Sequence, residues 1–312
     1  MAERFGLPGV RRVTAVAGGV INRSFLFELT DGAMWVCRVD VDHGRGKLAR
    51  EAAAYRWLWQ HAPGLPIASA YHVDPARDLI ADEYALLPRL SGFNLGADIE
   101  SLPDAVRAGL LVQVGALLRR LHALTDPDGN LIEAHYRGQP WREYCQVWFD
   151  NMLARCETRL GYAPTWAEQA RAWMRERITL LPESSSRVFL HGDFHFGNLQ
   201  YDVLPGPKLS GCFDLEWAWS GHAACDLLHL HEATVRYPHY EAPLLEGYGA
   251  SAWPRELIVY RLIQAIGVLG AAAVERPEPL WDLMAWHGAV IENVLKDRAP
   301  FTGLLRAGAG SA

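Results

Sequence analysis

A strand–loop–strand segment in the second half of the chain constrains its fold most. Residues 188–190 form an apolar run that predicts a buried strand, and the polar loop after it carries Asp193 and Asn198. A second apolar run, residues 209–213, ends at Asp214. If the two strands pair, the Asp-x4-Asn loop and the later carboxylate come close together. This is the layout that kinase-type phosphoryl transfer needs.

The residue types in this segment suit distinct parts of that chemistry. Asp193 would orient an attacking hydroxyl and accept its proton, while Asn198 and Asp214 would hold magnesium through oxygen. Asp and Asn are also common turn residues after a strand, so their spacing alone is a weak signal. The signal gains specificity from His191 ahead of the loop and from the position of Asp214 at the end of a hydrophobic strand.

With these residues in place, the chain resembles the aminoglycoside phosphotransferase and choline kinase-like family. That family carries a His-x-Asp-x4-Asn loop followed by an Asp-x-Asp/Glu metal motif, here residues 191–198 and 214–216. The resemblance covers nearly the whole chain and implies a protein-kinase-like α+β fold. The expected small mixed β-sheet lobe, residues 1–90, binds nucleotide, and the larger mainly helical lobe, residues 91–312, is catalytic and binds substrate. The implied cofactors are ATP, with GTP not excluded, and Mg2+.

The order of apolar patterns along the chain agrees with this two-lobe arrangement. In the first lobe the expected strands cover residues 13–20, 25–29, 34–39 and 83–87, with one helix over residues 47–61. The turn at residues 30–32 predicts a hairpin. In the second lobe the expected helices are one ending near residue 122, then 141–160, 166–181, 226–234, 256–273 and 281–295.

A small-residue loop between the first two expected strands is the candidate nucleotide-positioning loop. Its small and polar members would let backbone N–H groups approach a triphosphate: Gly18, Gly19, Asn22 and Ser24. An ordinary hairpin turn would have a similar sequence. No Gly-Lys-Ser/Thr follows, so this is not a Walker A loop.

Arg38 and Glu51 are expected to form an ion pair. Arg38 lies where the family places a phosphate-binding Lys or Arg, although an exposed strand Arg would look the same. Glu51 lies on the apolar face of the expected helix, and burying an unpaired carboxylate is costly. The pair would match the strand-Lys to helix-Glu pair of kinases.

Other polar residues near the motifs are expected to support the catalytic loop or the metal site. His191 is expected to brace the loop, and His195 to belong to the loop or to the substrate side. Glu216 would either ligate a second metal or lie outside the ligand set. Asp226 fits the family's Gly-x4-Asp-Leu pattern and is expected to cap or hold the catalytic loop. A transition-metal hydrolase is disfavoured, because the nearby histidines 229 and 231 diverge on a helix.

Composition excludes several classes of protein. The 312 residues carry a net charge of -6, which argues against nucleic acid as the main partner. The five cysteines are far apart, without a Cys-x-x-Cys pair, so neither a zinc site nor a disulfide framework is expected. No signal peptide or long apolar run appears, so we expect no membrane association and a cytoplasmic location.

The sequence therefore predicts an ATP- and magnesium-dependent transferase acting on a hydroxyl of a small polar molecule. The family's range includes aminoglycosides, macrolides, amino alcohols and sugars. Trp217 and Trp219 beside the metal motif would stack on such a substrate or pack in the core. The alternative is a non-catalytic nucleotide-binding protein of the same fold. Protein-kinase activity is disfavoured, because no Lys stands two residues after Asp193.

Overall fold

The computed structural model describes residues 1–16, 22–41, 46–126, 138–160, 165–184, 187–275 and 281–298. Their contacts divide the chain into two compact units. The first unit contains Met1–Leu124, Phe189–Trp219 and Glu246–Gly249, and the second contains the remaining segments. The first unit therefore combines the amino-terminal part of the chain with the segment that carries the Asp-x4-Asn loop.

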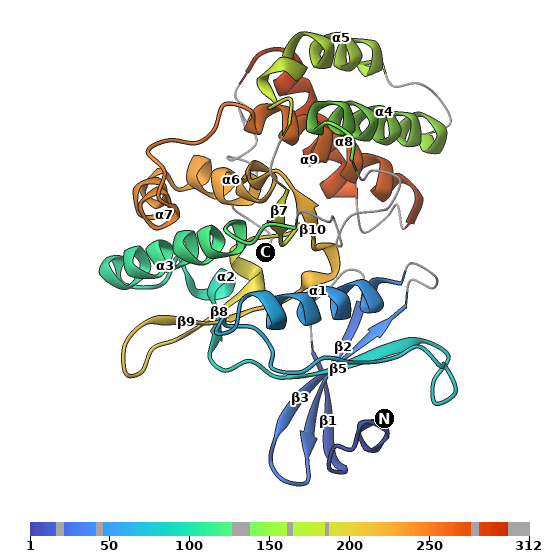
Figure 1. The fold of residues 1–312 in the computed structure, drawn as a ribbon, viewed down its shortest axis with the longest axis vertical. Coiled ribbons are helices and arrows are strands. Elements are labelled where there is room, and N and C mark those ends of the chain that lie inside the picture. Colours follow the sequence, from blue (N-terminus) through green and yellow to red (C-terminus); the bar gives the residue numbers. More distant parts are fainter. Residues whose placement is uncertain are drawn as a thin grey trace. The chain divides into compact units, whose positions relative to one another are not determined.

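The first unit contains a five-stranded antiparallel sheet in the order β1-β2-β3-β5-β4 (Figure 1). Its strands are β1 (Val10–Val16), β2 (Asn22–Leu29), β3 (Met34–Asp40), β4 (His72–Asp74) and β5 (Glu83–Pro88). The predicted hairpin joins β2 to β3, with Gly32 at a positive φ of 87°. This sheet places Arg38 on a central strand.

Helix α1 (Lys47–His61) has the bounds that the sequence predicts. Its buried positions recur every three or four residues: Leu48, Glu51, Ala52, Tyr55 and Leu58. Apolar packing explains most of this face, but Glu51, like the buried Lys47 at the start of the helix, needs a polar partner. The helix runs beside the sheet of the same unit (Figure 1).

A second sheet of the first unit frames the candidate catalytic loop. Strands β6 (Phe93–Asn94), β8 (Leu199–Asp202) and β9 (Lys208–Cys212) pair in the order β6-β8-β9. Short helix η4 (Phe196–Asn198) forms the end of the loop, and η5 (Leu215–Trp217) includes the last two residues of the metal motif. Two further helices complete the unit, α2 (Leu95–Asp98) and α3 (Asp104–His122), after the short amino-terminal η1 (Ala2–Phe5).

The second unit is mainly helical. Helix α8 (Leu257–Glu275) packs against α4 (Trp141–Leu160) and α9 (Trp281–Leu295), and α5 (Ala167–Arg177) packs against α9. The smaller elements are η3 (Ile178–Leu180), η6 (Ala223–Leu227), α6 (Leu228–Arg236) and η7 (Pro238–Tyr240). Strands β7 (Val188–Leu190) and β10 (Trp219–Gly221) form a two-stranded sheet. The boundaries between the two units fall within these two strands and within α7 (Glu241–Tyr248).

Most predicted elements are present, and the differences lie at their ends. The helices predicted over residues 141–160 and 281–295 have the observed bounds. Strand β1 covers Val10–Val16, so it begins three residues before the predicted start, and residues 17–20 of the predicted strand lie outside the described part. Strands β4, β6, β8 and β10 and helices α2 and α7 were not predicted. The strand over residues 209–213 pairs with β8 and not with the strand over residues 188–190, which pairs with β10. The mixed α+β class is confirmed, whereas the lobe boundary at residue 90 stays a prediction.

Two further sequence expectations concern single residues and helices. Cys37 and Cys212 are buried, as their apolar surroundings predict, and all five cysteines are free thiols. None of the helices in the described ranges is long and apolar enough to cross a membrane.

Candidate functional site

The loop between β7 and β8 depends on a glycine at its start. Gly192 has a positive φ of 83°, and a Cβ built on it would lie 2.0 Å from the carbonyl oxygen of Trp217. Such a separation is far inside van der Waals contact, so only glycine fits here. The loop is thereby held against the backbone that follows the metal motif.

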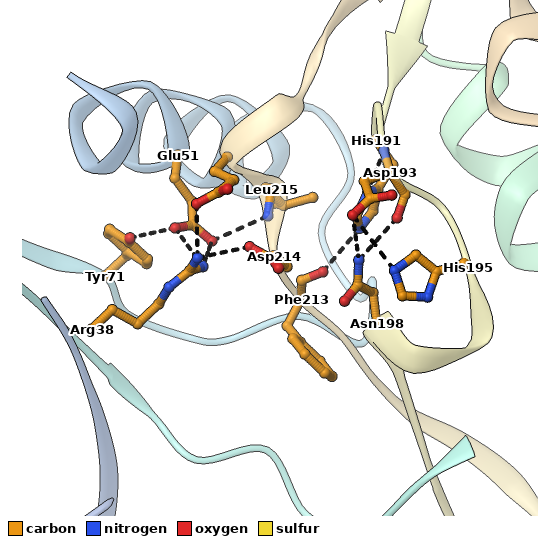
Figure 2. A network of polar contacts seen from close by, with 11 residues as sticks. Arg38, Glu51, Tyr71, His191, Asp193, His195, Asn198, Phe213, Asp214 and Leu215 are labelled. Carbon is orange, nitrogen blue, oxygen red and sulfur yellow. Dashed lines mark hydrogen bonds and ion pairs between the residues drawn. The ribbon is translucent and has the colours of Figure 1, made fainter. Parts of the chain in front are cut away.

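Asn198 holds Asp193 in the middle of this loop (Figure 2). Its Nδ2 donates to the main-chain oxygen of Asp193 at 2.9 Å and lies 3.3 Å from the carboxylate Oδ2. Asn198 is buried, whereas the Asp193 side chain is 32% exposed. The arrangement presents an oriented carboxylate to solvent, where an incoming hydroxyl can reach it.

His191 ties the loop to the strand that precedes Asp214. The main-chain N–H of Asp193 donates to its Nδ1 at 3.3 Å, so the ring proton is on Nε2, which donates to the carbonyl of Phe213 at 2.9 Å. Both ring nitrogens are used in backbone hydrogen bonds, and the side chain is fully buried. This geometry braces the loop.

His195 faces the carboxylate of Asp193 from the other side. The N–H of Gly197 donates to its Nδ1 at 3.0 Å, which leaves the proton of a neutral ring on Nε2. That nitrogen lies 3.5 Å from Oδ2 of Asp193. His195 is therefore oriented toward the carboxylate of Asp193, and the same side chain is 42% exposed.

The predicted ion pair of Arg38 and Glu51 is present. Nη1 of Arg38 lies 2.8 Å from both carboxylate oxygens of Glu51, and the two side chains are 11% and 0% exposed. Such a desolvated pair holds both partners in one geometry. Burial alone would lower the pKa of Arg38, but Glu51 and Asp214 raise it well above its ordinary value, so the guanidinium stays charged.

Two further donors complete the hydrogen bonding of Glu51. The hydroxyl of Tyr71 donates to Oε2 at 2.5 Å, and the N–H of Leu215 donates to Oε1 at 3.1 Å. Burial nevertheless raises the pKa of Glu51 to about 7, with Arg38 opposing the rise. Since Leu215 directly follows Asp214, one carboxylate joins Arg38 to the backbone of the metal motif (Figure 2).

Arg38 also contacts both acidic residues of that motif. Its Nη2 lies 2.8 Å from Oδ1 of Asp214 and 2.9 Å from Oε2 of Glu216. Asp214 adopts a left-handed backbone, with φ at 68°, and its side chain is 31% exposed. Glu216 is only 5% exposed, so its carboxylate is buried against Arg38.

The other candidate residues are less closely connected to this site. Ser24 lies opposite Arg38 in the β2–β3 register, and Asn22 begins β2, although its side chain is outside the described part. Gly18 and Gly19 lie outside the described residues. Asp226 is buried in η6, in the second unit, where its predicted role of capping or holding the loop stays a prediction.

The two tryptophans beside the metal motif differ in environment. Trp217 is 41% exposed, and Nζ of Lys47 and Cζ of Arg50 lie 5.7 and 5.9 Å from its ring centroid. Trp219 is half-buried. Cations thus already contact the ring of Trp217, as in cation–π pairs.

A model of the phosphotransferase enzyme family matches residues 12–258 of the sequence. The chain belongs to this family. No curated protein matches the sequence significantly. The family match spans both the sheet that carries Arg38 and the loop that carries Asp193 and Asn198, so it includes the whole site of the first unit.

Solved structures of aminoglycoside phosphotransferases share the fold. The GDP and kanamycin complex of APH(2")-IIia has a TM-score of 0.68 at 16% identity, covering 95% of this chain and 97% of that one. A thermostable mutant of APH(4)-Ia has a TM-score of 0.66 at 20% identity, with coverages of 99% and 98%. A putative aminoglycoside phosphotransferase from Ralstonia eutropha has a TM-score of 0.66 at 17% identity, with coverages of 93% and 93%. The protein-kinase-like fold of this phosphotransferase is thereby shown.

Oxygen atoms of Asp214 and Asn198 are of the kind that binds a divalent cation. The guanidinium of Arg38 lies within 2.9 Å of the carboxylates of Glu51, Asp214 and Glu216, and of these the Asp214 side chain is the most exposed, at 31%. The hydrogen bonds of Asn198 use its Nδ2, which leaves the amide Oδ1 as an oxygen ligand. Carboxylate and amide oxygens are ligands that Mg2+ prefers, usually alongside phosphate oxygens and water.

In the described ranges, no group of three or more His, Cys, Asp or Glu side chains is arranged to hold a metal ion. The oxygen ligands available at Asn198 and Asp214 suit a hard cation instead.

Sequence reasoning missed two residues that support the phosphotransferase site. Tyr71 lies in the coil before β4, where no periodic pattern marks it. Asn94 caps α2 by accepting from the N–H of Ala97 at 3.0 Å, and its Nδ2 donates to the carbonyl of Gly197 at 2.7 Å. The helix-cap preference of Asn was a usable signal for Asn94. No comparable signal exists for Tyr71.

Proposed function

We propose that this protein transfers the γ-phosphoryl group of ATP to a hydroxyl of a small polar molecule, with Mg2+ as cofactor. One observation carries the proposal. The first unit contains both a solvent-facing carboxylate, Asp193, oriented by Asn198, and a buried Arg38–Glu51 pair in contact with Asp214. These are the acceptor half and the phosphate half of a phosphotransfer site.

In this proposal Asp193 acts on the acceptor. Its carboxylate accepts a hydrogen bond from the hydroxyl and aligns the oxygen with the γ-phosphorus. A bond forms between that oxygen and phosphorus, the bond to the bridging oxygen of the nucleoside diphosphate breaks, and the hydroxyl proton passes to Asp193. Because the transition state is loose, orientation contributes more than basicity. His195 and His191 keep the carboxylate and its loop in place.

The remaining residues serve the nucleotide. Arg38 contacts phosphate oxygens while Glu51 holds the guanidinium, and the small-residue loop with Gly18, Gly19, Asn22 and Ser24 approaches the triphosphate. Asn198 and Asp214 hold the metal, and Glu216 orients Arg38. When bound, Mg2+ neutralises charge on the phosphate oxygens.

The named complexes of structural relatives support this class of reaction. One is a ternary complex of APH(4)-Ia with ADP and hygromycin B, and another contains GDP and kanamycin. For this protein, the proposed acceptors are therefore aminoglycosides, macrolides, amino alcohols and sugars. In the same proposal, residues 1–90 form the nucleotide lobe, and residues 91–312 the catalytic and substrate-binding lobe.

A label-transfer assay tests the proposal. The protein is incubated with γ-labelled ATP, Mg2+ and panels of these hydroxyl compounds, with generic protein substrates in parallel. We expect label on a small molecule, and loss of that label in the Asp193→Asn variant. Label on protein alone would contradict the small-molecule assignment. Nucleotide binding without transfer to any acceptor would favour the non-catalytic alternative.

A further inference from the structure

Tyr71 is a buried side chain that is hydrogen-bonded to Glu51 in the phosphate half of the site. It lies in the coil just before β4, is 8% exposed, and donates its hydroxyl hydrogen to Oε2 of Glu51 at 2.5 Å. No sequence motif contains it. The hydrogen bond to Glu51 is the contact that links Tyr71 to the site, so its role follows from that bond.

The carboxylate of Glu51 needs this donor. Its Oε1 accepts hydrogen bonds from Arg38 and from the N–H of Leu215, whereas Oε2 accepts from Arg38 and from Tyr71. The side chain of Glu51 is 0% exposed, so water does not reach it. A buried carboxylate that loses one of its donors is destabilised and reorients toward the donors that remain.

The ring of Tyr71 is itself held in place by α1. It stacks on Tyr55 with ring centroids 4.9 Å apart and an interplanar angle of 20°. Tyr55 follows Glu51 by four residues, so both lie on one face of the helix. Tyr71 thus contacts this face twice, through its ring and through its hydroxyl, which fixes the direction of the hydrogen bond.

We propose that Tyr71 is a positioning residue for nucleotide binding: its hydroxyl orients Glu51, and Glu51 in turn presents Arg38 to the phosphates. The proposal rests on the proposed function, because Arg38 contacts phosphate only if the protein binds a nucleotide. Tyr71 contacts no reacting atom. A ring that merely packs against Tyr55 would not need the hydroxyl, so removing the hydroxyl separates the two roles.

The structure supplies a matched control for that removal. The hydroxyl of Tyr55 is also fully buried, lies on the neighbouring ring, and makes no hydrogen bond. Tyr71→Phe and Tyr55→Phe therefore delete the same atom from the same stack. They differ in whether that atom bonds to Glu51.

Titration calorimetry of a non-hydrolysable ATP analogue, with Mg2+, tests the proposal. Tyr71→Phe should weaken binding about tenfold, the size expected for a hydrogen bond to a charged group. Tyr55→Phe should bind within about twofold of the unaltered protein, because it loses no hydrogen bond. In turnover assays, Tyr71→Phe should raise the KM for ATP and leave the KM for the acceptor unchanged.

A double variant identifies the route of the effect. In a Glu51→Gln background, Tyr71→Phe should change binding by less than about twofold, since the charged acceptor of its hydrogen bond is already gone. A full tenfold loss in that background, or equal binding by Tyr71→Phe and Tyr55→Phe, would overturn the role of Tyr71. Failure of the unaltered protein to bind nucleotide would instead overturn the proposed function.

Discussion

Asn198 faces Asp193 through a single amide nitrogen, which lies 2.9 Å from the main-chain oxygen and 3.3 Å from the carboxylate of that residue. Because Nδ2 faces Asp193, the amide oxygen of Asn198 faces away from it. One planar amide group therefore orients the carboxylate of Asp193, the proposed proton acceptor, and offers an oxygen for metal binding. The two halves of the proposed reaction depend on each other through this amide.

The first prediction concerns the charge of Asp193. Asp193→Asn should lower turnover by about 10²–10⁴-fold, the usual contribution of a positioned proton acceptor, while nucleotide binding stays nearly intact. Steady-state kinetics and calorimetry measure the two quantities. Asp104→Asn, on the exposed first turn of α3, serves as a control that should retain activity. Full activity in Asp193→Asn would exclude the assigned role.

The second prediction concerns metal dependence. Nucleotide should bind more tightly with magnesium than without it, and Asp214→Ala should remove most of this difference, because the variant loses a carboxylate ligand. Calorimetry of ATP with and without magnesium measures the effect. Asp202→Ala, which loses only an exposed hydrogen bond with Ser91, should keep the magnesium dependence. If Asp214→Ala keeps it too, Asp214 is not a metal ligand.

The third prediction concerns the pair of Arg38 and Glu51. Arg38→Gln and Glu51→Gln should each raise the KM for ATP and lower the free energy of unfolding, because each leaves a buried group without its charged partner. A double-mutant cycle should give an interaction energy of about 0.5–3 kcal/mol. Urea unfolding of the four proteins provides the measurement. Strictly additive effects would show that the contact is not energetically significant.

The fourth prediction concerns acid stability and the buried ring of His287 in α9. Burial lowers its pKa to about 4, and its Nδ1 has no hydrogen-bond partner. The unfolded chain, with an ordinary histidine pKa of about 6.5, binds the proton first as the pH falls. The free energy of unfolding should therefore be highest above about pH 6.5 and should fall by about 2–3 kcal/mol toward pH 4 from this group.

A variant without the titrating ring isolates that effect. His287→Gln lacks the titrating ring, so its free energy of unfolding should fall less between pH 6.5 and pH 4 than that of the unaltered protein. The carboxylates titrate alike in both proteins and therefore do not contribute to the difference. Urea unfolding at a series of pH values measures the two slopes. Identical slopes would mean that His287 does not remain neutral in the folded protein.

Local patterns determined many elements of this protein from the sequence. Helices α1, α4 and α9 have their predicted bounds, because apolar residues at three- and four-residue spacing mark a helix wherever it packs. The Arg38–Glu51 pair was also predictable. A carboxylate on an apolar helix face needs a cation, and the neighbouring strand offers one.

Only the tertiary structure decided which further groups surround the Arg38–Glu51 pair. Glu216 was expected either to ligate a second metal or to lie outside the ligand set, and its contact with Arg38 was not foreseen. Nor was the hydrogen bond that Tyr71 donates to Glu51 from a coil. No periodicity or spacing in the sequence marks either contact, because the donors to a buried carboxylate come from segments that only the folded chain brings close together. The sequence by itself determined the family motifs and the residues that need partners. The folded chain determined which residues are their hydrogen-bond partners, since a buried charged group has no water to replace a missing donor.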